Sequence, residues 1–328
     1  MKAIIITDKK PEPIQLIEAD IPQTQGDECL VRLDVAGLNR RDQWMREGLY
    51  PGIKHGTILG SDGCGVVEQG PDEWLGKKVI INPNINWGDN AEVQSGKYSI
   101  LGMPTHGTLA ELVKVPTHRL VEKPAHLSDE EAAVIPLAGL TAYRAVVTKG
   151  KVNSSKRVLI TGIGGGVSQF ALQYALALGA NVYVTSRDED KRQRAIKMGA
   201  KDGFISTNDN WWKDVLNVGQ FDTIIDSTGG NSVNIFLKII KPAGRIVLYG
   251  STAGYPEKLD TFRLFWTQAH IIGSTMGNDQ EFAEMVQFMS THSIRPTIDH
   301  VYPMGQYLQA LDRFKAPDHF GKIALRIR

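Results

Sequence analysis

Short hydrophobic runs alternate with amphipathic segments through the second half of the chain. Runs of strand length lie at residues 158–160, 182–184, 221–226 and 245–249. Segments with apolar residues at helical spacing lie between them, at residues 166–178 and 233–240. Short buried strands that alternate with helices are typical of a parallel sheet covered by helices on both faces. The pattern therefore predicts a doubly wound α/β domain.

A glycine-rich turn separates the first of these strands from the helix that follows it. The turn comprises Gly162, Ile163, Gly164, Gly165 and Gly166, and Val167 comes next. Glycine allows the backbone to approach phosphate closely, and free N–H groups at a helix N-terminus meet its charge. A strict Gly-x-Gly-x-x-Gly spacing would need glycine at Val167, so the looser pattern Gly162, Gly165, Ser168 fits better. We expect residues 162–167 to bind the pyrophosphate of a dinucleotide.

The end of the second strand bears on which dinucleotide is bound. An acidic residue there would bind the adenine ribose of NAD, but the nearest position is Ser186, followed by Arg187. A small hydroxyl beside a guanidinium, with Lys191 one helical turn further on, suits the 2′-phosphate of NADP(H). Two alternatives remain open. Arg187 and Lys191 could be a solvated face, and Asp188 could reach the ribose of NAD.

The first part of the chain has a different pattern. Alternating or apolar segments at residues 29–35, 78–81 and 109–115 predict strands, and Gly-, Pro- and Asn-rich loops join them. Ser128 and Glu131 form a capping box that should start a helix. The sequence therefore predicts an irregular, mostly β domain, and residues 323–327 predict a final strand.

Composition excludes several classes of function. The 328 residues are 42% hydrophobic and 22% charged, and the net charge is +1, so nothing favours nucleic acid or an anionic membrane as partner. No apolar run approaches membrane-spanning length, and the N-terminal run is too short for a secretory signal. Two cysteines, Cys29 and Cys64, make a disulfide framework improbable and agree with a reducing compartment. We expect a cytoplasmic protein.

Several motifs occur in an order that resembles the medium-chain dehydrogenase/reductase superfamily. They are residues 35–42, residues 59–67, the helix that contains residues 139–143, and then the glycine turn. The resemblance covers essentially the whole chain. It implies a GroES-like, β-rich catalytic domain at residues 1–123 with 294–328, and an NADP(H)-binding Rossmann domain at residues 124–293.

The positions that bind zinc in many members of this superfamily are altered here. The zinc alcohol dehydrogenases carry Cys where this chain has Asn39, and Gly-His-Glu where it has residues 60–62, which include Ser61. Their third ligand falls on or near Leu137. The structural zinc lobe likewise has Asn90 and Val93 where cysteines would stand. None of these side chains is a good zinc ligand, so we expect no metal.

Loss of zinc narrows the chemistry. Oxidation of a simple alcohol needs its proton removed, which zinc assists by stabilising the alkoxide. Without metal, hydride delivery to quinones or α,β-unsaturated carbonyls is easier, because these acceptors spread negative charge. The pattern Asn39-x-x-Asp42 resembles the zinc-free branch of quinone oxidoreductases. The resemblance thus implies an NADPH-dependent reductase of such acceptors. Two alternatives remain: an alcohol or aldehyde oxidoreductase of the same fold, and a non-catalytic NADPH-binding protein.

The resemblance also assigns roles to single residues. Asn39 would donate its amide N–H to a substrate oxygen. Asp42 would orient that group, or simply cap a helix start, and Tyr50 would donate a phenol O–H, or simply pack. Further residues are expected to contact the cofactor: Thr141, Ser251, Thr252, Ser274, Thr275 and Lys322, the last at the pyrophosphate.

Residues 271–275 read as the last strand of the nucleotide-binding sheet. An unpaired strand at a sheet edge can pair with the same strand of a second copy, and related proteins dimerise in this way. We expect a homodimer through this edge; a covered edge in a monomer is the alternative.

Overall fold

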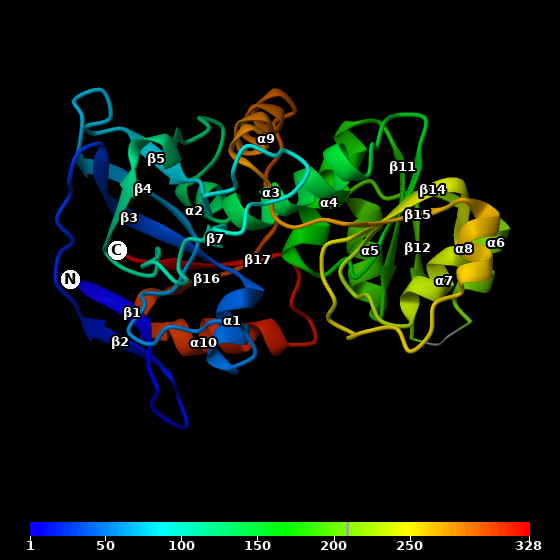
Figure 1. Ribbon diagram of the computed structural model, residues 1–328, viewed down its shortest axis with the longest axis horizontal. Helices are drawn as coiled ribbons and strands as arrows, with labels where there is room; N and C mark the ends of the chain where they lie inside the picture. The colour runs from blue at the N-terminus through cyan, green and yellow to red at the C-terminus, as the bar shows by residue number, and fades with distance from the viewer. Residues whose placement is uncertain (208–209) are drawn as a thin grey trace. The chain divides into compact units, whose positions relative to one another are not determined.

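The computed structural model describes residues 1–207 and 210–328. Within it the chain forms two compact units. Unit 1 comprises Met1–Ala138 together with Asn278–Arg328, and unit 2 comprises Gly139–Gly277. Figure 1 follows the chain through both units by colour.

Unit 2 is built on a six-stranded parallel sheet. Its strands, in chain order, are β10 (Arg157–Ile160), β11 (Asn181–Ser186), β12 (Asp202–Ile205), β13 (Phe221–Asp226), β14 (Ile240–Leu248) and β15 (His270–Gly273). Their order in the sheet is β12-β11-β10-β13-β14-β15, and every neighbouring pair is parallel. This is the strand order of a Rossmann dinucleotide-binding domain, whose ligand site lies where the order reverses, between β10 and β13. The predicted doubly wound sheet is confirmed.

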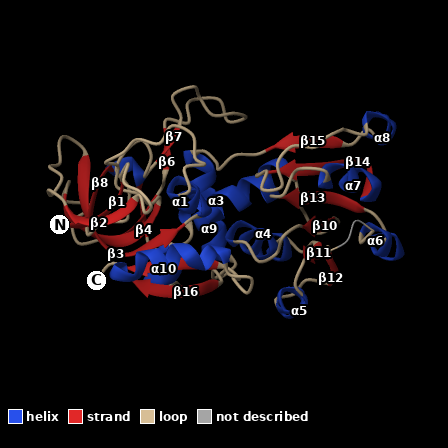
Figure 2. Cartoon of the chain, turned by 90° about the horizontal axis from the view of Figure 1, so that it is seen from below, coloured by secondary structure: helices blue, strands red, loops and turns tan. Residues whose placement is uncertain are grey.

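Helices cover both faces of this sheet. Those of unit 2 are α4 (Gly166–Ala177), α5 (Glu189–Lys197), α6 (Trp212–Val218), α7 (Ser232–Ile239) and α8 (Thr261–Thr267). Figure 2 shows α4 and α5 on one face and α6, α7 and α8 on the other. The central strands β10, β11 and β13 are mostly apolar because both of their faces are largely buried. Leu159, Phe221 and Ile224 pack in one core cluster with Phe236 of α7.

Unit 1 is a mostly β structure. Its strands are β1 (Lys2–Ile6), β2 (Ile14–Glu18), β3 (Glu28–Leu38), β4 (Asp62–Gln69), β5 (Lys78–Ile81), β6 (Asn84–Ile85), β7 (Ser99–Ile100), β8 (Leu112–Pro116), β9 (Leu120–Glu122), β16 (Ile298–Pro303) and β17 (Lys322–Arg326). The main sheet has the order β16-β17-β3-β4-β5-β9, and β8 also pairs with β3. The C-terminal strand β17 thus lies antiparallel beside β3, with Ile323 opposite Leu38. This register brings Lys322 next to the end of β3.

The helices of unit 1 are short, except for one. They are α1 (Arg40–Arg46), α2 (Asp129–Ala133), α9 (Asp279–Thr291) and α10 (Tyr307–Asp312), and α3 (Pro136–Tyr143) begins in this unit. The predicted capping box at α2 is confirmed, because Ser128 and Glu131 each accept a hydrogen bond from the other's backbone N–H. None of the helices within the described ranges has the length and hydrophobicity to span a bilayer.

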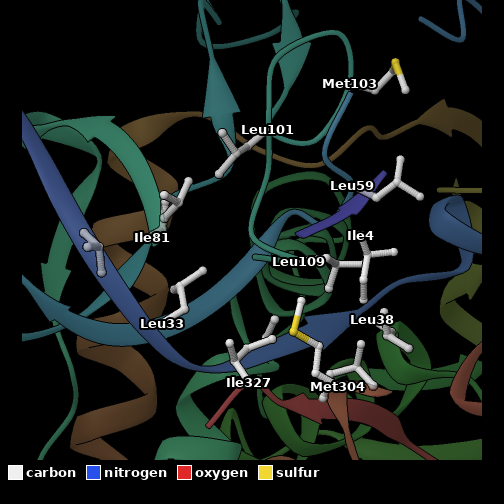
Figure 3. Close-up of a cluster of buried hydrophobic side chains, with 14 of the residues drawn as sticks. Ile4, Leu33, Leu38, Leu59, Ile81, Leu101, Met103, Leu109, Met304 and Ile327 are labelled. Carbon is white, nitrogen blue, oxygen red and sulfur yellow. The ribbon is translucent and has the colours of Figure 1, made fainter. Parts of the chain in front are cut away.

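The core of unit 1 joins the two ends of the chain. Buried side chains from the first strand, such as Ile4, pack in one cluster with Leu33 and Leu38 of β3 and with Met304 and Ile327 near the C-terminus. Figure 3 shows this cluster. The C-terminal segment is therefore part of the same folded unit as the N-terminal strands.

The boundaries between the units differ from those expected from the sequence. The expected divisions lay after residue 123 and before residue 294, whereas α2 and α9 belong to unit 1. Asp279, the first residue of α9, accepts hydrogen bonds from Asn82, Asn84 and Arg119. Helix α2 lies so close to β3 that a Cβ at Gly37 would be 2.6 Å from the carbonyl oxygen of Ala133. These contacts hold both helices to the β domain.

Candidate functional site

A buried polar cluster lies where β3 ends and α1 begins. Asn39 is the N-cap residue of α1. Its backbone N–H donates to Asp42 Oδ2 at 2.8 Å, the carboxylate half of a capping box. Asp42 therefore caps the helix start and at the same time fixes the backbone of Asn39. Asp42 is fully buried, and its Oδ1 has no hydrogen-bond partner within the described part of the chain.

Asp62, the first residue of β4, links this polar cluster to the start of helix α3. Its Oδ2 accepts from Asn39 Nδ2 at 2.9 Å, and its Oδ1 accepts from the backbone N–H of Leu137 at 2.8 Å. Thr108 Oγ1 donates to the Asp62 carbonyl at 2.8 Å. The fully buried Asp62 carboxylate is thus held by two donors, and the backbone carbonyl of Asp62 by a third.

Lys322 completes the cluster from β17. Its ammonium donates to Leu38 O at 2.8 Å, Asn39 Oδ1 at 2.6 Å and Asp62 Oδ2 at 3.2 Å. An ammonium only donates and a carboxylate only accepts, so the Asn39 amide has one orientation: oxygen toward Lys322 and nitrogen toward Asp62. The ammonium has three N–H groups and three acceptors, which leaves none for the pyrophosphate contact expected from the sequence.

A second buried cation lies beside Ser61. Arg41 Nη1 donates to Ser61 Oγ and to Leu101 O, and Ser61 Oγ itself donates to Leu101 O at 2.8 Å. Arg41 Nη2 donates to the Tyr50 hydroxyl at 3.1 Å, and the guanidinium also faces the Tyr50 ring, 4.9 Å from its centroid. Tyr50 both packs against the core and keeps its own O–H proton for another acceptor.

Burial shifts the ionisation of this cluster. Desolvation raises the pKa of Asp42 to about 6, against the opposing attraction of Arg41. Desolvation also lowers the pKa of Lys322, although Asp62 acts in the opposite direction. Both shifts disfavour the charged forms, which persist only because each charge has close partners.

The raised pKa of Asp42 predicts a dependence of stability on pH. The folded protein holds this proton more tightly than the unfolded chain, so stability falls as pH rises from 3.8 toward 6, and the full cost is present above that. Asp42→Asn keeps an oxygen for the Asn39 N–H and removes the charge. Between about pH 4 and pH 7 the free energy of unfolding of the variant, relative to wild type, should therefore rise by up to about 3 kcal/mol. Denaturant unfolding of both proteins at both pH values measures this; a difference that does not change with pH would contradict it.

In unit 2 the glycine turn has the geometry of an anion site. Gly162 has a φ of +59°, which favours glycine, and its N–H donates to Thr185 Oγ1 at 3.2 Å. Ser168 Oγ donates to the carbonyls of Gly162 and Gly165, which closes the turn. Among residues 162–168, the backbone N–H groups of Gly164, Gly166, Val167 and Ser168 have no protein partner within the described part of the chain. These groups lie at the start of α4, where a pyrophosphate would be bound.

The end of β11 shows where the predicted specificity residues lie. Ser186 is buried, and its Oγ accepts from the Asp188 N–H at 3.0 Å. Asp188 is the N-cap residue of α5, and its Oδ1 accepts from the backbone N–H of Lys191 at 2.9 Å. Arg187 is exposed. The carboxylate that could have bound the ribose of NAD is therefore engaged in capping a helix.

The remaining predicted cofactor residues lie at different places in unit 2. Thr141 is buried on α3. Ser251 and Thr252 lie in the exposed turn after β14 and hydrogen-bond to Gly254 O and Ser227 O. Ser274 and Thr275 follow β15, and Ser274 Oγ is buried without a partner among the described residues. Apart from Thr141, all of them follow the carboxyl ends of sheet strands, as expected for this fold.

Sequence reasoning missed three functional candidates. Two of them, Arg41 and Ser61, belong to the buried polar cluster of Asn39, Arg41, Asp42, Ser61, Asp62 and Lys322, which we call the unit 1 cluster. Asp226, at the end of β13, is fully buried and accepts from Thr161 Oγ1, from both the N–H and Oγ1 of Thr228, and from the Gly229 N–H. The sequence signal for Asp226 is its position at the end of an apolar strand. A carboxylate buried at such a place needs several hydrogen-bond donors, which indicates a structured polar site.

The residues of the cluster do not fit a zinc ion. Zinc sites use several Cys, His or carboxylate ligands. Within the described residues no group of three or more His, Cys, Asp or Glu side chains could hold a metal ion. Asn39 and Asp62 already share the Lys322 ammonium, and Ser61 faces the Arg41 guanidinium. A dication placed here would meet two fixed positive charges.

Comparison with known proteins places the chain in a family. Residues 25–125 match the alcohol dehydrogenase GroES-like domain, and residues 166–291 match the zinc-binding dehydrogenase family. The zinc-type alcohol dehydrogenase-like protein YogA of Leptosphaeria maculans is 34% identical, over 96% of this chain and 95% of that protein. The crystal structure of an NAD-dependent alcohol dehydrogenase is 33% identical over the whole of both chains, with a TM-score of 0.93. A crotonyl-CoA reductase of Streptomyces avermitilis is 28% identical, over 97% of this chain and 83% of that protein.

These similarities extend over both units and confirm the resemblance drawn from the motifs. The GroES-like match covers most of the strands of unit 1, and the second match begins at α4, directly after the glycine turn. The chain therefore belongs to the medium-chain dehydrogenase/reductase family, as an oxidoreductase of its zinc-type alcohol dehydrogenase-like group.

Proposed function

We propose that this protein is a zinc-independent, NADPH-dependent reductase that transfers hydride to a quinone or an α,β-unsaturated carbonyl. The observation that carries the proposal is the Asn39 amide, whose orientation Lys322 and Asp62 fix and whose second Nδ2–H has no protein partner among the described residues. Such a preorganised donor stabilises negative charge that develops on an oxygen. Asn39 is 6% exposed as a residue, beside the fully buried Asp42 and Asp62.

The chemistry of these acceptors suits the cluster. When bound, a reduced nicotinamide would supply the hydride to an electrophilic carbon, and the electron pair of the broken π-bond would move to the acceptor oxygen. The Asn39 N–H then hydrogen-bonds an enolate or phenolate oxygen, which solvent protonates afterwards. No alcohol proton has to be removed before hydride transfer, so no metal is required. The name of the crotonyl-CoA reductase relative refers to an α,β-unsaturated acyl group, which supports this acceptor class.

The preference for NADP(H) rests on the end of β11. Ser186 has no charge that would repel a 2′-phosphate, Arg187 is exposed beside it, and Asp188 is engaged at the start of α5. Similar proteins named NAD-dependent alcohol dehydrogenases belong to the same family, so the family alone does not decide the cofactor. An alcohol dehydrogenase activity is accordingly the second candidate function.

The test is an acceptor panel with purified protein. We expect oxidation of NADPH with quinones or conjugated enones, at a kcat/KM at least about tenfold higher than with NADH, since a phosphate–guanidinium pair stabilises by more than 1 kcal/mol. Simple alcohols with NADP⁺ or NAD⁺ should turn over far more slowly. Faster alcohol oxidation would support the second candidate, and tight NADPH binding without turnover of any acceptor would indicate a non-catalytic protein.

We also propose a homodimer that pairs the β15 edges of two copies. In the described sheet β15 has β14 as its neighbour on one side, and its other side is an edge. Helix α8, which precedes β15, exposes the aromatic side chains of Phe262, Phe265 and Trp266. A monomeric mass in analytical ultracentrifugation would contradict this proposal.

A further inference from the structure

The unit 1 cluster contains its own cation. The Lys322 side chain is 4% exposed, and its ammonium lies between the Leu38 carbonyl, the Asn39 amide oxygen and the Asp62 carboxylate. Burial of a lysine is costly unless every N–H finds an acceptor, and this one has three. Burial of this positive charge costs desolvation free energy that its ion pair need not recover, so stability alone does not explain why a lysine lies here.

The geometry gives Lys322 two effects on Asn39. First, donation to Oδ1 prevents the amide from rotating by half a turn, which would present its oxygen instead of its nitrogen to a substrate oxygen. Second, the positive charge polarises the amide and makes its N–H a stronger donor, because hydrogen bonds in a chain strengthen one another in a low-dielectric interior. Asp62 contributes to the orientation only, since its negative charge opposes an oxyanion.

We propose that Lys322 is the fixed cation of the reduction site, a positioning residue that orients and polarises the Asn39 amide toward the oxyanion formed by hydride transfer. This inference rests on the proposed function and adds the source of positive charge in a site whose residues do not fit a metal. It also replaces the pyrophosphate contact that the sequence led us to expect of Lys322. The two roles differ in measurable ways.

The experiment compares wild type with Lys322→Met, which keeps the length of the side chain and removes its charge. With an acceptor that wild type reduces, we expect kcat to fall about 100-fold, as for loss of an oxyanion donor, while the dissociation constant of NADPH measured by fluorescence stays within about twofold. Weakening of NADPH binding by about tenfold or more, with kcat unchanged, would instead show a pyrophosphate contact and overturn the proposal. Lys315→Met is the matched control, because Lys315 is exposed and, among the described residues, pairs with Glu47 alone.

A graded series of substituted enones separates polarisation from a merely structural role. If Lys322 stabilises the oxyanion, the decrease in kcat caused by Lys322→Met should be largest for acceptors whose enolate oxygen is most basic. A plot of log kcat against the basicity of the enolate oxygen should then be steeper for the variant than for wild type. An equal loss for every acceptor would overturn the proposal. If wild type itself reduces no acceptor, the proposed function fails first, so the two failures are distinguishable.

Removal of Lys322 alone leaves the Asp62 carboxylate buried without its cation, which can unfold a protein. The double variant Lys322→Met/Asp62→Asn removes both charges and keeps an acceptor oxygen for the Asn39 Nδ2–H, while Leu38 O and Asn39 Oδ1 lose the Lys322 donor. We expect it to fold, as near-ultraviolet circular dichroism would show, and to keep the same steeper dependence on enolate basicity. A folded double variant with the rates of wild type would overturn the proposal.

Discussion

Asn39→Asp should lower kcat for enone or quinone reduction about 100- to 1,000-fold, the range observed for loss of one oxyanion donor. The change keeps the size of the side chain and an oxygen acceptor for Lys322, but it replaces the amide NH2 group, with its two N–H donors, by a second acceptor oxygen. Negative charge on the substrate oxygen would then face a carboxylate. The dissociation constant of NADPH should remain within about twofold, because the expected pyrophosphate site lies at the glycine turn of unit 2.

The control is Asn181→Asp, the same chemical change at an exposed position at the start of β11. Steady-state kinetics with saturating NADPH give kcat for both variants, and circular dichroism verifies that each is folded. A decrease of less than about threefold in the Asn39 variant would show that Asn39 does not stabilise the developing negative charge, because loss of an oxyanion donor lowers kcat at least about 100-fold.

Gly107→Ala should lower the free energy of unfolding by about 3 kcal/mol or more, the upper range for inserting a methyl group into a packed site. Residues 107–109 run beside residues 58–60: the N–H of Gly107 donates to Ile58 O at 2.8 Å and that of Leu109 to Leu59 O at 2.8 Å. A Cβ at Gly107 would overlap the Gly60 carbonyl oxygen and approach the Cα of Gly102 to 2.6 Å. Both neighbours are backbone and cannot move as a flexible side chain would.

The strain would also be transmitted to the site, because Ser61 and Asp62 follow Gly60 directly. We therefore expect a loss of activity in the fraction of Gly107→Ala that still folds. Gly96→Ala is the matched control, since a Cβ there has no neighbour within 4 Å, and its unfolding midpoint should change little. Urea unfolding of both variants measures the difference. Equal midpoints would show that residues 107–109 can move to accommodate the methyl group without loss of stability. That result would contradict the inference that this segment fixes the position of residues 60–62.

Local patterns in the sequence predicted much of unit 2 because its strands and helices are short and regular. The strand expected at residues 221–226 is β13 with the same bounds, and the glycine turn lies directly before α4 as predicted. Apolar runs, a capping box and a glycine turn are all encoded within a few residues. Nothing in their prediction requires knowledge of distant contacts.

The unit 1 cluster could be predicted only in part, because it depends on contacts between distant segments. Asn39 and Asp42 were found through their resemblance to a motif, but Lys322 reaches Asn39 across 283 positions of sequence. Its place follows from the register of β17 against β3, which no local pattern specifies. Arg41 was overlooked because a charged residue at the start of a helix is usually solvated, whereas here the side chain is turned inward to Ser61 and Leu101.

We propose that protein hydrogen bonds and a fixed ammonium, and not a bound metal ion, polarise the acceptor. The most direct measurement is the metal content of the purified active protein by inductively coupled plasma mass spectrometry, with turnover recorded before and after dialysis against a chelator. We expect no stoichiometric zinc and an unchanged rate of NADPH-dependent reduction. One zinc ion per chain, whose removal abolishes the rate and whose return restores it, would show instead that a metal ion polarises the acceptor.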